Sequence, residues 1–210
     1  MARDTNASCR KCRRAGEKLF LKGDRCGGLK CAIVRKNYAP GVHGKKFSRG
    51  NSEYGKQLSM KQKIKRIYGV LEKQFRKHFK QASKHHGVTG DLLMARLEMR
   101  LDNVVYRMGF GNSRKQSRQL VNHGFVNVNG KKVDIASFEV KIDDVISVSA
   151  LKKEKEYFKK QSEILKNKKD FPSWILFDES KFEGKITAVP KGDEVEVGTD
   201  PQMVVEYYSR

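Results

Sequence analysis

The hydrophobic pattern changes along the chain from a helical period to the alternation that is typical of strands. Between residues 52 and 81, apolar side chains recur at three- and four-residue steps, which predicts one helix with an apolar face. Ser52 precedes Glu53, so its hydroxyl is placed to cap the first turn. A second run over 91–109 keeps the same period and ends at Gly109, a residue type that often stops helices. The middle of the chain is therefore predicted to be helical.

The pattern beyond residue 110 predicts a short helix followed by strands. A polar pair at 112–113 can cap a helix over 114–123. Alternation over 125–128 then runs into an Asn-Gly pair at 129–130, which favours a hairpin because both turn residues need positive φ. Residues 138–148 alternate again on either side of an Asp-Asp turn. We therefore predict an α+β fold with a two-helix plus β-hairpin module.

The C-terminal tail has a different composition. Residues 151–169 are rich in lysine and glutamate with apolar positions seven apart, which favours a surface helix. The apolar run that begins at Trp174 suggests a buried anchor. Residues 171–210 hold 4 Lys and Arg against 8 Asp and Glu. An acidic segment in a basic protein suggests contact with a neighbouring protein.

Charge narrows the function. The chain has 210 residues and a net charge of +21, and residues 1–90 alone carry +19. A folded chain this basic repels itself unless a polyanion neutralises it, so nucleic acid is the first candidate partner and an anionic membrane surface the second. No apolar run approaches the roughly 18 residues of a membrane helix, and no apolar signal core follows Met1.

Four cysteines lie close together near the start of the chain, at Cys9, Cys12, Cys26 and Cys31. Zinc binds four thiolates tetrahedrally, and the C-x2-C-x13-C-x4-C spacing predicts a zinc knuckle. Four thiolates leave no open position, so one structural Zn²⁺ is expected. Two disulfides or four unpaired thiols are the alternatives, and a reducing compartment disfavours the disulfides.

Candidate RNA contacts form two groups. In the first 66 residues they are Arg10, Arg13, Arg14, His43, Lys45, Lys46, Arg49, Tyr54, Lys56, Lys61, Lys65 and Arg66. In the helix and hairpin they are Arg114, Lys115, Ser117, Arg118, Gln119, Asn122, His123, Lys131 and Lys132. Basic side chains neutralise phosphates, and extended basic loops often follow a backbone. Any single one could be a solvated charge, and His43 could instead be a metal ligand, but as groups they favour RNA binding.

Several motifs closely resemble the small-subunit ribosomal protein four family, bacterial type. They are RLDNVVYR at 100–107, SRKQSRQLV at 113–121, VNGKKV at 128–133, SEYGKQL at 52–58, YGVLEKQF at 68–75, PSW at 172–174 and EYYSR at 206–210. The resemblance implies direct binding of small-subunit rRNA early in assembly, at a junction of RNA helices. It also implies messenger RNA nearby where it enters the subunit, an effect on decoding accuracy, small-subunit ribosomal protein five as a neighbour, and a cytoplasmic, ribosome-bound protein. Many members keep a four-cysteine zinc knuckle.

The alternative function is an RNA-modifying enzyme or an RNA-binding stress protein, because both classes use the same module. An enzyme needs a catalytic domain beside it, and the chain has no G-x-G-x-x-G, phosphate loop or paired His-Glu metal motif. We therefore expect no catalytic residues. The expected domains are a zinc knuckle and basic arm over 1–51, a helical domain over 52–97, the RNA-binding module over 98–160, and a C-terminal segment over 161–210 that packs back on the helical domain.

Overall fold

The computed structural model describes residues 4–46, 50–166, 170–179, 181–191 and 198–210. These residues form two compact units. Unit 1 takes in the described residues up to Met94 together with those from 198 onward, and unit 2 takes in those from Ala95 to 191. Over the described ranges, no helix combines the length and apolar character that a membrane span requires.

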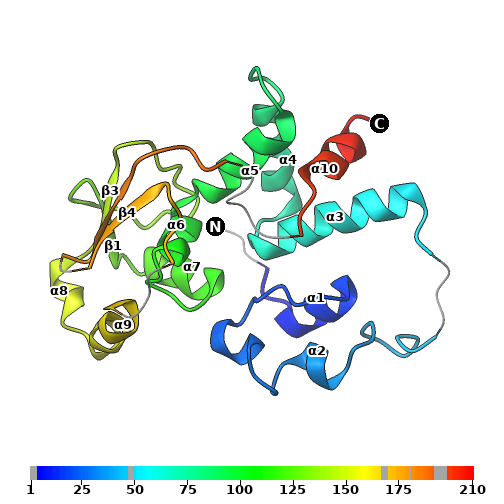
Figure 1. Cartoon of the computed structure of the whole chain (residues 1–210), viewed down its shortest axis with the longest axis horizontal. Coiled ribbons are helices and arrows are strands. Elements are labelled where there is room, and N and C mark those ends of the chain that lie inside the picture. Colours follow the sequence, from blue (N-terminus) through cyan, green and yellow to red (C-terminus); the bar gives the residue numbers. More distant parts are fainter. Residues whose placement is uncertain (1–3, 47–49, 167–169, 180, 192–197) are drawn as a thin grey trace. The chain divides into compact units, whose positions relative to one another are not determined.

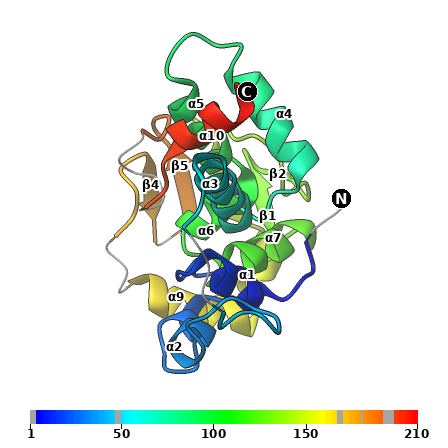
Figure 2. The same ribbon diagram turned by 90° about the vertical axis from the view of Figure 1, so that its right-hand side faces the viewer.

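Unit 1 is helical. Its elements are α1 (Ser8–Ala15), the 3-10 turn η1 (Gly23–Cys26), α2 (Ala32–Arg35), α3 (Glu53–Ile67), α4 (Glu72–Ala82), the start of α5 (Thr89–Glu98), and α10 (Pro201–Tyr208). The C-terminal helix α10 lies beside α3, as both views of the ribbon show (Figures 1 and 2). Pairing of the two helices buries Val204 of α10 and Ile64 and Ile67 of α3. The last helix of the chain is therefore part of the same unit as α3.

The prediction of one helix over 52–81 is wrong, because α3 and α4 are separate helices. Gly69 adopts a φ of +64°, and the N–H of Val70 donates to the carbonyl of Lys65 at 3.1 Å. This is the left-handed stop that glycine permits after a helix. The apolar period continues across the break, so periodicity alone does not reveal it. The predicted cap is confirmed, since the Ser52 hydroxyl accepts a hydrogen bond from the Gly55 N–H at 3.2 Å.

Unit 2 contains the rest of α5, further helices and one sheet. Its helices are α6 (Leu101–Arg107), α7 (Arg114–Asn122), α8 (Ala150–Lys153) and α9 (Glu156–Lys166). The run over 91–109 thus divides into α5 and α6, and the chain pairs with Glu139 at the junction through an isolated bridge from Arg100. The predicted cap of α7 is confirmed by a 3.4 Å hydrogen bond from the Gln116 N–H to the Ser113 hydroxyl.

One antiparallel sheet in unit 2 has the strand order β2-β1-β3-β5-β4. Its strands are β1 (Val126–Val128), β2 (Lys131–Lys132), β3 (Val145–Val148), β4 (Ile175–Asp178) and β5 (Glu183–Ile186). The predicted hairpin is confirmed, with φ values of +49° at Asn129 and +77° at Gly130. The prediction of a strand over 138–142 is wrong, because the only β-pairing of this stretch among the described residues is the isolated bridge between Glu139 and Arg100.

The core of unit 2 joins the helices to the sheet. Its buried side chains come from α6, α7, α9 and four of the strands, and Trp174 is 1% exposed within it, as the sequence predicted. The α+β prediction with a helix-and-hairpin module is therefore confirmed. Residues 161–210, expected as one segment, contribute β4 and β5 to the sheet of unit 2 and α10 to unit 1. Backbone pairing of β5 with β3 holds the first part in unit 2.

Candidate nucleic-acid interface

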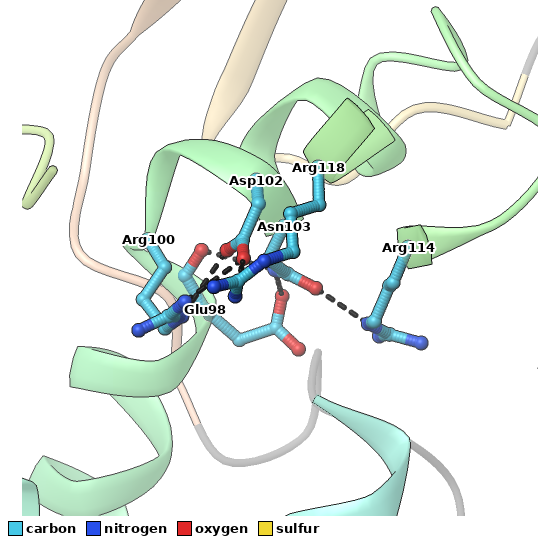
Figure 3. A network of polar contacts seen from close by, with 6 residues as sticks. All are labelled: Glu98, Arg100, Asp102, Asn103, Arg114 and Arg118. Carbon is cyan, nitrogen blue, oxygen red and sulfur yellow. Dashed lines mark hydrogen bonds and ion pairs between the residues drawn. The ribbon is translucent and has the colours of Figure 1, made fainter. Parts of the chain in front are cut away.

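A buried carboxylate organises the start of α6 in unit 2 (Figure 3). Asp102 accepts hydrogen bonds from Nε and Nη2 of Arg100 at 3.1 and 2.8 Å. Nη1 of Arg118, which comes from α7, reaches the same carboxylate at 3.2 Å. The side chains of Arg100 and Asp102 are only 1% and 6% exposed. Two guanidinium groups therefore share one buried carboxylate, which ties α7 to α6.

A second buried carboxylate extends this network. Glu98 is fully buried and receives Nε and Nη2 of Arg107 at 2.9 and 2.6 Å. It also accepts a hydrogen bond of 2.6 Å from the amide of Asn103. The amide oxygen of Asn103 in turn accepts from Nε of Arg114 at 2.7 Å, and the Arg114 guanidinium lies 4.6 Å from the centre of the Tyr106 ring. Arg114 is thereby fixed in one orientation.

The network is rich in guanidinium groups. Among the described residues, these are the groups of Arg100, Arg107, Arg114 and Arg118, which pair with Glu98, Asp102 and Asn103. Guanidinium groups with fixed orientation suit phosphate oxygens. The sequence had assigned Arg114 and Arg118 to the RNA-facing side of α7. In the structure both are half-buried, so each also supports the protein fold.

Ser117 lies on the buried side of α7. It is fully buried, and a Cβ added to Gly111 would lie 2.5 Å from its hydroxyl oxygen. The close approach of Gly111 excludes any RNA from this position in the folded protein. Ser117 therefore packs inside the protein and does not make the RNA contact that we predicted. Because serine is polar, nothing in the sequence indicated that this position is buried.

The remaining candidates in unit 2 are accessible. Exposed side chains are those of Lys115, Gln119, Asn122, His123, Lys131 and Lys132. Gly124 follows α7 with a φ of +62°, and a Cβ there would lie 2.1 Å from Cε of Lys132. The hairpin lysine thus crosses the end of α7, where positive charge is favoured by the helix dipole. The hairpin therefore places Lys132 beside the exposed end of α7.

The N-terminal arm of unit 1 offers exposed cations. Arg10, Arg14, His43, Lys45 and Lys46 are exposed, whereas Arg49 lies outside the described residues. Arg13 is half-buried, and its Nε donates to the carbonyl of Tyr38 at 2.9 Å. Its guanidinium group lies 4.6 Å from the centre of the Tyr38 ring. Arg13 therefore fastens the chain after α2 to α1.

Arg66 of α3 is close enough to Arg14 for their charges to interact. Burial lowers the pKa of Arg66 from its ordinary value, and the charge of Arg14 lowers it further. Asp4 and Cys12 act in the opposite direction. Two guanidinium groups that repel each other gain from an anion between them, which is consistent with a phosphate contact.

The start of α3 is exposed, whereas its centre is engaged. Tyr54 and Lys56 are exposed. Lys61 is buried, and it and Lys65 donate to the two oxygens of Glu72 at 2.7 and 2.9 Å. The ammonium group of Lys61 therefore pairs with a carboxylate inside the unit, and the RNA contact expected of it stays a prediction.

Glu72 links three helices, because the Tyr208 hydroxyl of α10 also donates to it at 2.8 Å. Burial raises the pKa of Glu72, but the hydrogen bonds from Lys61, Lys65 and Tyr208 outweigh burial and bring it to about 2. Burial and then the bond to Glu72 raise the pKa of Tyr208. The ionised carboxylate is thus the form that holds α3, α4 and α10 together.

Unit 1 is expected to lose stability in acid through Glu72. Its pKa is lowered from 4.5 to about 2 on folding, so its contribution is present above about pH 4.5 and is lost as pH falls toward 2. Glu72→Gln should lower helix stability at neutral pH and flatten its dependence on pH in this window. Far-ultraviolet circular dichroism during acid titration measures both, with Glu53→Gln at the exposed start of α3 as control. Identical acid profiles for wild type and Glu72→Gln contradict the prediction.

The four cysteines surround one small cavity in unit 1. All four are free thiols, and Cys12, Cys26 and Cys31 are buried. The cavity has a volume of about 20 Å³, enough for a single small ion. Burial raises the pKa of the Cys12 thiol, a backbone hydrogen bond at Leu19 lowers it, and the other three cysteines raise it. All four cysteines line this cavity, yet among the described residues no three His, Cys, Asp or Glu side chains stand close enough to form a ligand group.

Comparison with known proteins covers both units. Residues 3–98 match the family model described as "Ribosomal protein S4/S9 N-terminal domain", and residues 99–146 match the "S4 domain". The chain is 52% identical to "Small ribosomal subunit protein uS4" of Clostridium tetani over 210 residues, which is 100% of both chains. It is 53% identical to "Small ribosomal subunit protein uS4A" of Clostridium perfringens, again over 100% of both chains.

The chain belongs to the ribosomal protein S4 family. This membership confirms the resemblance seen in the motifs and the prediction that the chain is not an enzyme. The boundary between the two matched domains, at residues 98 and 99, falls where α5 ends and α6 is about to begin. The S4 domain of this chain therefore includes Asp102 and the rest of α6 and α7.

Sequence reasoning missed several residues of the buried polar network that supports α6 and α7. They are Glu98, Arg100, Asp102, Asn103 and Arg107. A signal existed, because charged and polar residues interrupt the apolar run over 91–109 at these positions. Their partners lie up to 16 positions away, and neither pairing nor burial follows from spacing alone.

Proposed function

We propose that this protein binds small-subunit rRNA directly, as a structural component of the small ribosomal subunit in the cytoplasm. The observation that carries the proposal is the full-length relation to small-subunit proteins of about half identical sequence. The structure supports it with two basic surfaces. One is the exposed arm of unit 1, and the other is the end of α7 with the hairpin lysines.

The family resemblance extends this proposal to timing and neighbours. We infer early binding at a junction of RNA helices, proximity to messenger RNA where it enters the subunit, and an effect on decoding accuracy. Small-subunit ribosomal protein five is the proposed protein neighbour, in keeping with the excess of acidic residues over 171–210. Specificity for a junction comes from the shape of the RNA, because the deep major groove of A-form RNA is closed to side chains.

Cosedimentation tests the proposed function against the enzyme alternative. The protein should sediment with small ribosomal subunits at one copy per subunit, and it should produce no turnover of free RNA. When the subunit proteins are added one at a time to bare small-subunit rRNA, this protein should be among those that bind before any other protein is present. Failure to bind bare rRNA, or catalytic modification of RNA, contradicts the proposal.

We further propose that the four thiols hold one structural zinc ion. Four free thiols that line one cavity are the donor set that structural zinc takes, and Cys9, Cys12, Cys26 and Cys31 are the residues that would hold it once they draw together around the ion. Bound zinc would cross-link α1 to the segment that contains η1 and α2. Because ligands must lose their protons, zinc uptake should release protons and weaken in acid.

Elemental analysis should find one zinc per chain, and Cys9→Ser should abolish stable binding and unfold the arm. Unit 2 should remain folded, because it has its own core around Trp174. Trp174 is the only tryptophan, so its fluorescence reports unit 2 alone. Thr5→Ser, an exposed position in the same arm, serves as control. A metal-free native protein with four reactive thiols would refute the zinc proposal.

A further inference from the structure

A cavity of about 240 Å³ opens beside α7 in unit 2. It is lined by Gln116, Gln119, Leu120, His123, Phe125 and Tyr157. The first four of these are at positions i, i+3, i+4 and i+7 of the helix, so they share one face. This face is distinct from the one that carries Arg114, Ser117, Arg118 and Val121. The helix thus divides its side chains between the buried network and this cavity.

The walls combine aromatic surface with polar groups at the rim. The Phe125 ring packs against Phe158 at 5.8 Å between centres, and the Tyr157 hydroxyl is bonded to the Phe110 carbonyl at 2.8 Å. Both rings are therefore fixed by contacts inside the protein. Gln119, by contrast, is exposed, and its amide offers a donor and an acceptor side by side.

Two lysines add positive charge beside the aromatic wall. Nζ of Lys152 and Nζ of Lys155 lie 4.2 and 5.2 Å from the centre of the Phe125 ring. Lys152 also donates to the His123 carbonyl at 2.6 Å, at the end of α7. An anion beside this cavity therefore meets two ammonium groups, while a flat ring in it meets Phe125 and Tyr157.

We propose that this cavity holds one unpaired nucleotide of the bound RNA, with its base against the aromatic wall and its phosphate near Lys152 and Lys155. The volume is below the roughly 300–1,000 Å³ of pockets for drug-sized ligands, which suits a single base. Sequence-specific RNA recognition relies on splayed bases that stack on aromatic rings and pair along their edges. Gln119 is the group that reads the base edge. The inference rests on the proposed rRNA binding and adds a place where base identity matters.

Full-length protein and intact small-subunit rRNA provide the test. Gln119→Ala should weaken binding about fivefold or more and leave the salt dependence unchanged, because an amide neutralises no phosphate. Lys155→Ala should instead lower the slope of log affinity against log salt by about one. Phe125→Leu should weaken binding by about fivefold to a hundredfold, the range for one stacked base. The fluorescence of Trp174 verifies that each variant keeps unit 2 folded.

Chemical probing of base edges locates the nucleotide. One unpaired base should be protected by wild type and by Thr187→Ala, an exposed position of unit 2 that neither lines the cavity nor belongs to the candidate RNA contacts. The same base should become reactive in complexes with Gln119→Ala and Phe125→Leu. If wild type binds rRNA and the protections are identical in all four proteins, the cavity holds no base and the inference is overturned. If wild type does not bind rRNA at all, the proposed function fails instead.

Discussion

Affinity for small-subunit rRNA is expected to fall about a thousandfold or more when salt rises from about 50 to 200 mM. Residues 1–90 carry a net charge of +19. Among them, the side chains of Arg10, Arg14 and Lys46 are exposed and can neutralise phosphates. Each neutralised phosphate releases condensed counterions, and about six to ten of them give a loss of this size. Filter binding at several salt concentrations measures the slope directly.

Variants of the hairpin provide the internal control for this prediction. Lys131→Ala combined with Lys132→Ala should reduce the slope by about two if both side chains meet phosphates. Heparin serves as an equally charged competitor that lacks RNA structure. A flat salt dependence, or equal affinity for heparin and folded rRNA, contradicts a specific RNA complex of the kind proposed.

Asp102→Ala is expected to destabilise unit 2 by about 3–5 kcal/mol, the cost of leaving a buried partner charge uncompensated. Arg100 is 1% exposed, and both of its hydrogen bonds in the network go to Asp102. Arg118 loses its ion pair in the same step, so the contact between α6 and α7 weakens as well. Urea unfolding followed by Trp174 fluorescence measures the change, since Trp174 lies in the same core.

A surface aspartate of the same unit gives the matched control. Asp134 is exposed and follows the hairpin. The free energy of unfolding of Asp134→Ala should therefore stay within about 0.5 kcal/mol of the wild-type value. Replacing Arg100 and Asp102 together by apolar residues of similar size should restore much of the lost stability, because neither charge is then buried alone. A single Asp102→Ala variant as stable as Asp134→Ala would show that the network does not support the fold.

The sequence alone determined those parts of this protein that depend on neighbouring residues. Ser52 and Ser113 were predicted as helix caps, and both hydroxyls accept the expected N–H. The Asn-Gly pair at 129–130 required positive φ and has it. Such features follow from local sterics and hydrogen bonding. The net charge and the family motifs, which pointed to RNA and the small ribosomal subunit, also need no coordinates.

Tertiary structure alone decided which polar residues face solvent and which segments pair across long stretches of chain. Lys61 and Ser117 looked like RNA contacts, yet one is paired with Glu72 and the other is packed beside Gly111. Neither β4 nor β5 was predicted, because their hydrogen bonds go to each other and to β3, some 40 residues earlier. A side chain's exposure depends on what the fold brings against it, and those partners are distant in sequence. For that reason spacing identified the helix over 114–123 as a functional element, while only the folded S4 domain divided its side chains between a buried ion network and an open cavity.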